Sequence, residues 1–343
     1  MKIAYTGSHF PKRVWQGVKG YINGQGYEVD MIKLSVKNAQ AHKDDLKGYG
    51  IIICSGEAYD GDTIRYLASH GLRMLSRHGV GTDEIDKETA TGLGIAITNA
   101  AGTLSASVAE CALALTLMVL RQFSFLDRRM REGYWDGKTH FLSELRNKTV
   151  GLIGFGGIAQ QFAYYLSPFD CRLLAYDPLF NKEKGERLLV LEASLDEICA
   201  QSDVISLHLP LTDETRGMVD IQFMKKMKRE AILINTSRGA IINEADLCEA
   251  LQAGLIAGAG LDVYESEPLG TVSPLLHMDN AVLLPHVAAH TYESQLDAGL
   301  MACRNAVNFI RGIPPESLVN PGYAKFAQNA NNAQRLRCAQ KKG

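Results

Sequence analysis

The sequence has no large excess of charge of either sign. Lysine and arginine number 36 and aspartate and glutamate number 38, which gives a formal net charge of −2. A protein that binds nucleic acid or an anionic membrane through its overall charge needs a positive excess. The balance therefore indicates neither nucleic acid nor a membrane as a partner.

The sequence also lacks any pair of cysteines with the CxxC spacing. Its cysteines are odd in number and widely scattered: Cys54, Cys111, Cys171, Cys199, Cys248, Cys303 and Cys338. A disulfide framework or a common zinc site needs an even or closely spaced set. We therefore expect no bound metal and a reducing compartment, the cytoplasm.

Long hydrophobic runs are absent as well. The most apolar stretch, Cys111 to Leu120, is bounded by Glu110 and Arg121, whereas a membrane-spanning helix needs about 20 apolar residues. This stretch is predicted to be a buried helix. The first residues lead directly into a strand-like pattern rather than into a basic and then apolar segment, so we expect no secretory signal.

Short apolar runs alternate with helix-compatible stretches in two series along the chain. With 343 residues the chain is longer than one hydrophobic core usually supports. The predicted strands are Lys2–Tyr5, Tyr27–Ile32, Ile51–Ser55, Leu72–Ser76 and Ile95–Asn99, then Thr149–Ile153, Arg172–Tyr176, Val204–Leu207, Ala231–Ile234, Gly258–Leu261 and Ala281–Leu284. This pattern predicts an α/β protein with two doubly wound, Rossmann-like parallel sheets and a cleft between them.

One long helix, from Ser105 to Arg131, is predicted between the two series. We expect a flavodoxin-like domain made of residues 1–99 and 290–323, and a Rossmann domain made of residues 100–289. Residues 324–343 contain basic but no acidic side chains and few groups to bury. They are predicted to form a flexible tail.

A glycine-rich segment follows the first strand of the second series. Gly154 permits a tight turn, Gly156 and Gly157 let the backbone approach a pyrophosphate, and Ile158 continues into a helix. Exposed N–H groups at the start of that helix suit a phosphate. Asp177 ends the next strand, where a carboxylate can accept hydrogen bonds from ribose hydroxyls, which favours NAD over NADP.

Polar segments follow three later predicted strands. They are Asn235-Thr236-Ser237-Arg238-Gly239, Asp262-Val263-Tyr264-Glu265-Ser266-Glu267-Pro268 and Leu284-Pro285-His286. The carboxyl ends of parallel strands face the ligand crevice of an open sheet. An arginine, a glutamate and a histidine gathered there would supply an anion clamp, an orienting carboxylate and a proton carrier.

These motifs, in this order, resemble those of the D-isomer-specific 2-hydroxyacid dehydrogenase family, which includes phosphoglycerate, glycerate and D-lactate dehydrogenases. The resemblance extends from about Ile51 to Pro321. It includes the segment from His78 to Asp86, Ser107-Val108-Ala109-Glu110, the glycine-rich segment and His208-Leu209-Pro210-Leu211-Thr212. It implies that the domain of residues 1–99 and 290–323 binds the substrate and that the domain of residues 100–289 binds NAD. It also implies reversible hydride transfer between NAD and the C2 carbon of a D-2-hydroxy acid.

The resemblance also assigns roles to individual residues. Arg238 would bind the substrate carboxylate and C2 oxygen, His286 would be the general acid and base, and Glu267 would orient its imidazole. The backbone of Val80 and Gly81 would face the substrate carboxylate. By the same resemblance Asp262 would face the nicotinamide amide, and the cofactor groove would be lined by His208, Leu209, Pro210, Thr236 and Ser237.

The substrate itself is left open. Arg77 matches an arginine found in members that act on phosphoglycerate, whereas Cys54 stands where such members often have a second one. His78 adjoins this motif, and its side chain either lines the pocket or packs in the core. Phosphoglycerate-type and hydroxypyruvate- or glyoxylate-type substrates both stay candidates.

Two further expectations concern the whole protein. The segment Ser105–Arg131 resembles the one through which family members dimerise, so a homodimer is predicted. The same fold also occurs in proteins that respond to NAD without turnover, and an NAD-responsive binding or co-repressor-like protein is the alternative to an enzyme.

Overall fold

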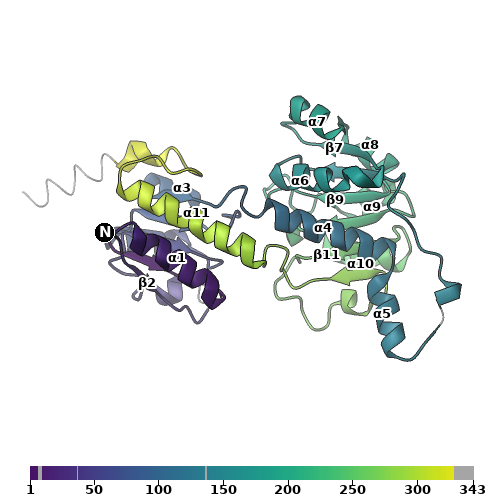
Figure 1. Cartoon of the computed structure of the whole chain (residues 1–343), viewed down its shortest axis with the longest axis horizontal. Coiled ribbons are helices and arrows are strands. Elements are labelled where there is room, and N and C mark those ends of the chain that lie inside the picture. The colour runs from purple at the N-terminus through teal and green to yellow at the C-terminus, as the bar shows by residue number, and fades with distance from the viewer. Residues whose placement is uncertain (7–9, 37, 136, 328–343) are drawn as a thin grey trace, which may run out of the picture. The chain divides into compact units, whose positions relative to one another are not determined.

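The computed structural model describes residues 1–6, 10–36, 38–135 and 137–327. The chain divides into two compact units (Figure 1). Unit 1 consists of Met1–Leu104 together with the chain from Thr291 onward, and unit 2 consists of Ser105–His290. The sequence analysis placed the domain boundaries between residues 99 and 100 and between residues 289 and 290. Of the predicted tail, residues 328–343 lie outside the described part of the chain.

Unit 1 contains a five-stranded parallel sheet in the order β2-β1-β3-β4-β5. The strands are β1 (Ile3–Tyr5), β2 (Val29–Met31), β3 (Ile51–Cys54), β4 (Met74–Arg77) and β5 (Ala96–Thr98). Four α-helices cover it: α1 (Lys12–Gly24), α2 (Gly61–Ser69), α3 (Lys87–Gly92) and α11 (Tyr292–Ile310). Helices lie on both faces, so the central strands are largely apolar, as in β3, where all four residues are buried.

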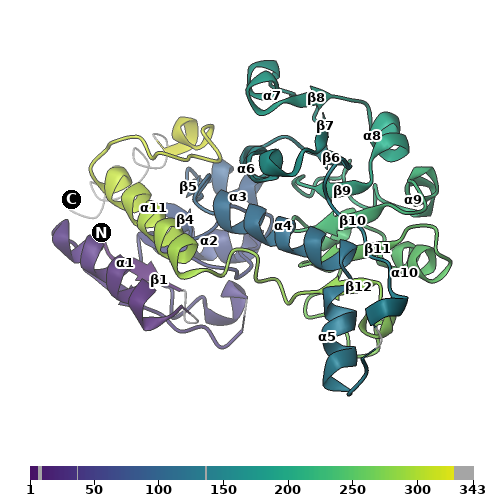
Figure 2. The same cartoon turned by 45° about the vertical axis from the view of Figure 1, so that its right-hand side comes forward.

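The two faces of this sheet have separate hydrophobic cores. Helices α1 and α11 lie side by side in both views and pack on one face (Figures 1 and 2). The other face is covered by α2 and α3. The strand order is that of a flavodoxin-like sheet, whose ligands bind beyond the carboxyl ends of the strands.

Unit 2 contains a seven-stranded parallel sheet in the order β12-β11-β10-β9-β6-β7-β8. Its strands are β6 (Thr149–Ile153), β7 (Arg172–Tyr176), β8 (Val190–Glu192), β9 (Val204–Leu207), β10 (Ile232–Asn235), β11 (Gly258–Leu261) and β12 (Ala281–Leu283). This is the doubly wound order, with the chain reversing direction across the sheet between β6 and β9. The fold class predicted for both units is thus confirmed.

Helices cover both faces of this sheet too. They are α4 (Ser105–Leu120), α5 (Phe123–Arg131), α6 (Gly157–Leu166), α7 (Lys182–Leu188), α8 (Leu195–Gln201), α9 (Ile221–Lys226) and α10 (Glu244–Gln252). Helices α4 and α6 pack together on one face, and α8, α9 and α10 cover the other (Figure 2).

The described residues of both units also include short 3₁₀ helices at Ala39–His42, Gly137–Thr139, Ser167–Phe169, Gly239–Ile241 and Pro274–His277.

Two sequence predictions about unit 2 were wrong. The single helix expected from Ser105 to Arg131 is broken, because Gln122 adopts a left-handed conformation with φ of 48°, and α4 and α5 meet at a bend of 63°. The edge strand β8 was not predicted, since only one of its three residues is buried.

In the described part of the chain, no single helix has both the length and the apolar character needed to cross a membrane. The bent pair α4 and α5 meets the criteria of length and composition when its two helices are taken together.

Candidate active site

The glycine-rich turn joins β6 to α6 at the carboxyl edge of the unit 2 sheet. Gly154 has φ of +93°, and a Cβ there would lie 2.5 Å from the carbonyl oxygen of His208. Only glycine fits, for reasons of both conformation and space. Gly156 precedes the helix with open space where a Cβ would project, and Gly157 is the first helical residue. The backbone at this turn suits a pyrophosphate at the helix N-terminus.

Asp177 lies beside this turn, at the end of β7. Its Oδ2 accepts a hydrogen bond of 2.7 Å from the Phe155 N–H, and its Oδ1 accepts one of 2.8 Å from the Leu179 N–H. A surface groove of about 500 Å³ begins here and is lined by Tyr176, Asp177, Pro178, Glu192, Ala193, Ser194 and Glu197. The carboxylate predicted from sequence is therefore next to the glycine-rich turn, in a groove with two further acids.

Two buried polar atoms lie along the same edge without a hydrogen-bond partner among the described residues. They are Nε2 of His208, which follows β9, and Oγ1 of Thr236, which follows β10. Burial lowers the pKa of His208 to about 3, so its imidazole is neutral at physiological pH. Leu209 and Pro210 are more exposed, and Ser237 is half-buried with its N–H and hydroxyl both donating to Asn235.

The histidine and glutamate predicted to be catalytic lie against each other. Nδ1 of His286 donates a hydrogen bond of 2.6 Å to Oε2 of Glu267. Both side chains are partly exposed. With Nδ1 committed to the carboxylate, Nε2 is the ring nitrogen that can exchange a proton with a substrate.

Arg238 lies in the turn that follows β10. Asn235 at the strand end fixes this turn, because its Nδ2 donates to the Arg238 carbonyl at 2.9 Å. The Arg238 guanidinium is half-buried, and its Nη1 donates to the Ser237 carbonyl at 2.7 Å. At Gly239 a Cβ would lie 1.8 Å from the carbonyl carbon of Tyr264. The turn that carries Arg238 thus lies directly against the segment that leads to Glu267.

Asp262 is hydrogen-bonded to the loop that carries His286. Its side chain is fully buried, and its two oxygens accept hydrogen bonds from the N–H groups of Val287 at 2.7 Å and Ala288 at 2.9 Å. Burial raises the pKa of this carboxyl, against the opposing effect of the two N–H groups. The observed partners are backbone amides next to His286, and contact with a nicotinamide amide stays a prediction.

In unit 1 the predicted substrate residues form a tight loop after β4. The Nε of Arg77 donates to the Gly81 carbonyl at 3.0 Å, and its Nη1 donates to the His78 carbonyl at 2.9 Å. The Val80 carbonyl accepts from Nδ2 of Asn99 at 2.8 Å. The half-exposed backbone of Val80 and Gly81 is therefore fixed in place by Arg77 and Asn99.

The His78 side chain is packed inside unit 1. It is 4% exposed, stacks on Phe10 with ring centroids 4.2 Å apart, and is hydrogen-bonded through Nδ1 to the Tyr5 hydroxyl at 2.5 Å. Burial lowers the pKa of His78 to about 3. The structure thus favours packing of the His78 side chain in the core over lining of the substrate pocket. His78 contributes only its backbone to the loop after β4.

The sequence analysis assigned no role to two buried polar residues, Glu57 and Ser107. Glu57, after β3, is 5% exposed and accepts hydrogen bonds from the Ser55 N–H and from the Tyr59 and Thr6 hydroxyls. Ser107, in α4, donates to the Ala288 carbonyl at 2.5 Å. Ser107 belongs to a motif that the sequence analysis quoted, whereas nothing in the sequence marks Glu57 as buried.

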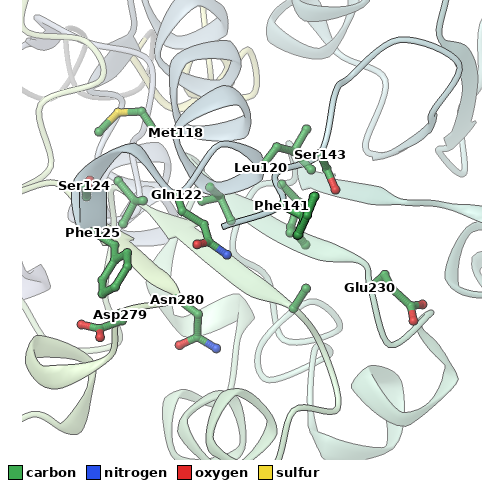
Figure 3. Close-up of a pocket in the computed structure, with 14 residues that line it drawn as sticks. Met118, Leu120, Gln122, Ser124, Phe125, Phe141, Ser143, Glu230, Asp279 and Asn280 are labelled. Atoms are coloured by element: carbon green, nitrogen blue, oxygen red, sulfur yellow. The ribbon is translucent and has the colours of Figure 1, made fainter. Parts of the chain in front are cut away.

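A partly open hollow in unit 2 of about 100 Å³ lies away from these residues (Figure 3). Its lining includes Ile232, Ala257 and Asn280, at the amino ends of β10, β11 and β12, together with Phe125 and Phe141. The predicted catalytic residues follow the carboxyl ends of those strands. The hollow is therefore not the active site. In the described residues, no group of acidic, histidine or cysteine side chains could hold a metal ion.

The model of the D-isomer specific 2-hydroxyacid dehydrogenase NAD-binding domain matches residues 113–288. The chain belongs to this family. The predicted family and its NAD-binding domain are thereby confirmed, and the glycine-rich turn described above fits that cofactor.

The curated relatives carry two different enzyme names. The chain is 39% identical over 300 residues to D-3-phosphoglycerate dehydrogenase of Archaeoglobus fulgidus, which covers 88% of this chain but 56% of that protein. It is also 39% identical over 268 residues to glyoxylate reductase of Korarchaeum cryptofilum, covering 76% of this chain and 80% of that protein. The chain thus spans little more than half the length of the phosphoglycerate dehydrogenase that it matches.

Solved structures of the family have the same fold. A glyoxylate reductase from Paecilomyes thermophila superposes with a TM-score of 0.81 at 29% identity, covering 93% of this chain and 98% of that one. The NAD-complexed enzyme from Lactobacillus delbrueckii superposes with a TM-score of 0.76 at 25% identity, covering 93% and 100%.

Proposed function

We propose that the protein catalyses reversible NAD-dependent hydride transfer between a D-2-hydroxy acid and its 2-oxo acid. The observation that carries this proposal is the hydrogen bond between His286 and Glu267, on the same sheet edge as Arg238 and the glycine-rich turn. A proton carrier, an anion-binding group and a dinucleotide turn are the three parts that this reaction needs. An NAD-responsive binding protein would need only the last of them.

Each side chain has a defined task in this reaction. Nicotinamide, when bound, would supply or accept the hydride that moves to or from the C2 carbon of the substrate. In the reducing direction, Nε2 of His286 gives its proton to the C2 oxygen, so that a 2-oxo acid, NADH and one proton become a 2-hydroxy acid and NAD. Glu267 keeps the imidazole oriented and stabilises its positive charge before the transfer. Arg238 binds the substrate carboxylate through its planar array of donors.

The acidic groove favours NAD over NADP. Asp177, Glu192 and Glu197 all line it, and the Asp177 carboxylate is fixed beside the turn. The additional phosphate of NADP would place a negative charge among these carboxylates, which like-charge repulsion disfavours.

We further propose that the preferred substrates are small, unphosphorylated 2-oxo acids such as glyoxylate or hydroxypyruvate. A phosphorylated substrate needs a second cationic site. At the loop after β4, two guanidinium nitrogens of Arg77 already donate to carbonyl groups, and Cys54 is buried. The carboxylate buried at the end of the neighbouring strand, that of Glu57, adds negative charge at the same sheet edge.

The test is NADH oxidation with a panel of 2-oxo acids: glyoxylate, hydroxypyruvate, pyruvate, a branched acid and phosphohydroxypyruvate. We expect turnover with NADH well above that with NADPH, and a higher kcat/KM for an unphosphorylated acid. A preference for phosphohydroxypyruvate would overturn the substrate proposal and leave the reaction class intact. No turnover with any acid, together with NADH binding, would support the NAD-responsive binding protein instead.

We also propose that the partner is a second copy of this chain, in keeping with the balanced charge and the expected cytoplasmic location. Helix α5 and the segment after it expose a cluster of apolar side chains: Phe123, Met130, Tyr134, Trp135 and Phe141. Trp135 is 88% and Phe141 is 97% exposed. Exposed aromatic clusters of this kind are typical of interfaces.

Sedimentation analysis of the wild type and of a Trp135→Ser, Phe141→Ser double variant tests the homodimer. We expect a dimer for the wild type and a monomer for the variant. A wild-type monomer at micromolar concentration would contradict the proposal. The exposed pair Leu179→Ser and Val272→Ser, which lies elsewhere in the chain, is the matched control.

A further inference from the structure

The chain passes between the two units at two places. The outgoing crossing is close to His286 in sequence, and the incoming one is close to the His286 loop in space. It enters unit 2 at Ser105 and leaves it after His290. Ser107, in the first turn of α4, donates its hydroxyl to the carbonyl of Ala288 at 2.5 Å. A buried hydrogen bond therefore joins the incoming and the outgoing segments within unit 2.

The outgoing segment also carries His286, whose backbone is unusual. His286 has φ of +54°, in the left-handed region that residues other than glycine rarely adopt. Such a conformation persists only where the surroundings fix it. The next two residues, Val287 and Ala288, are held through both of their N–H groups by the buried carboxylate of Asp262.

Ser107 and Asp262 together form hydrogen bonds with both N–H and C=O groups of the loop backbone. Asp262 binds the N–H groups of Val287 and Ala288, and Ser107 binds the Ala288 carbonyl. Both side chains are buried, with Ser107 7% exposed and Asp262 fully covered. The His286 imidazole is hydrogen-bonded to Glu267, whereas these bonds of Ser107 and Asp262 go to backbone groups of the loop.

We infer that Ser107 and Asp262 are positioning residues for His286, acting through the backbone of Val287 and Ala288. They keep the left-handed conformation that directs the imidazole to Glu267, at the point where the chain leaves unit 2. The inference deepens the proposed function and rests on it, because it assigns His286 the proton transfer. It adds a role for Ser107 and gives Asp262 one that does not depend on contact with the cofactor.

The first variant is Ser107→Ala, and its matched control is Thr116→Val. Thr116 is a second buried hydroxyl of α4, bonded to the Ala112 carbonyl within the helix and far along it from the loop. We expect Ser107→Ala to lower kcat by about 10- to 100-fold, since small displacements of catalytic groups have effects of this size. The NADH dissociation constant should stay within about twofold, and Thr116→Val should leave kcat and the pH profile unchanged.

The second variant, Asp262→Asn, replaces one acceptor oxygen by an NH₂ group that faces a backbone N–H. We expect a larger loss of kcat and a shifted pH profile of kcat/KM, again with NADH affinity retained. A weakened NADH affinity with an unchanged pH profile would make Asp262 a cofactor ligand and overturn its positioning role. Ser107→Thr, which keeps the hydroxyl, should restore most of the activity lost in Ser107→Ala.

Titration of the His286 imidazole by NMR in wild type and Ser107→Ala provides a readout that needs no turnover. We expect the histidine resonance to shift its titration midpoint in Ser107→Ala and not in Thr116→Val. An unchanged midpoint together with unchanged kcat would overturn this inference alone. A wild type that fails to turn over any 2-oxo acid would overturn the proposed function alone, and the NMR comparison would still test the positioning.

Discussion

Oε2 of Glu267 lies 2.6 Å from Nδ1 of His286, although the two residues follow different strands, β11 and β12. The pair forms because the strands are parallel neighbours, so that their carboxyl ends meet at one edge. In addition, the Tyr264 hydroxyl donates to the Leu284 carbonyl at 2.8 Å, which ties the two segments together before they reach the pair.

Replacing His286 by Asn should lower kcat by about 10²- to 10⁴-fold, because general acid–base catalysis contributes on this scale. Glu267→Gln should lower kcat less and shift the pH profile, since the imidazole keeps a partner but loses the adjacent charge. The measurement is NADH oxidation with the best 2-oxo acid over a range of pH. Glu265→Gln, two positions away and exposed, is the control, and equal losses in both glutamate variants would contradict the assignment.

Replacing Arg238 by Lys should raise KM about 10- to 100-fold with little change in NADH affinity. A hydrogen bond to a charged group contributes about 1.5–3 kcal/mol, and a lysine ammonium cannot reproduce the planar array of guanidinium donors. Steady-state kinetics and NADH fluorescence titration measure the two quantities. The exposed Arg229→Lys serves as the control, and unchanged KM in Arg238→Lys would show that the carboxylate is bound elsewhere.

The two glycines of the cofactor turn should respond differently to alanine. Gly154→Ala forces a Cβ to within 2.5 Å of the His208 carbonyl at positive φ, so this variant should lose stability. Gly156→Ala projects its Cβ into open space, so the fold should be unaffected while NADH binds more weakly, because that space is where a pyrophosphate would approach. Thermal unfolding and NADH titration of both variants separate the two effects. Full NADH affinity in Gly156→Ala would place the pyrophosphate elsewhere.

Burial of His208 should make the stability of unit 2 depend on pH. The pKa of His208 is about 3 in the folded protein against an ordinary value near 6.5. Between these values the unfolded chain binds more protons, so the free energy of unfolding should fall as the pH is lowered from about 6.5 toward 3, by at most about 1.4 kcal/mol per unit. Above about pH 6.5 His208 is neutral in both the folded and the unfolded chain, so its titration lowers the free energy of unfolding only below that pH.

Urea unfolding of the wild type, His208→Gln and His277→Gln over this pH range tests that expectation. His208→Gln should weaken the pH dependence, because glutamine does not titrate. His277 is exposed, so His277→Gln should follow the wild type. Parallel pH dependences for all three proteins would mean that His208 does not contribute.

The sheets and the catalytic pair could be predicted because their signals are local and strong. The buried strands are nearly continuous apolar runs, and the motif residues follow them directly, so Arg238, Glu267 and His286 were placed at one edge from sequence alone. The edge strand β8 carries no such signal, since two of its three residues are exposed. The break between α4 and α5 lies at Gln122, a residue type that gives no warning of a left-handed conformation.

The observed contacts of Ser107, Asp262 and Glu57 could not be predicted from the sequence for a different reason. Each depends on contacts with backbone groups or hydroxyls far along the chain, as between Ser107 and Ala288. A polar residue next to a motif looks the same whether it faces a ligand or a neighbouring loop. His78 illustrates the point, since it adjoins the substrate loop and yet stacks on Phe10 in the core.

The proposed catalytic residues and the hollow beside α5 lie at opposite ends of the same strands. Arg238, Asp262 and His286 follow the carboxyl ends of β10, β11 and β12, whereas the hollow beside Phe125 and Phe141 lies at their amino ends (Figure 3). A reporter dye attached to α5 should therefore respond to subunit association without obstructing turnover. Association and chemistry can then be followed in one sample, each as the internal reference for the other.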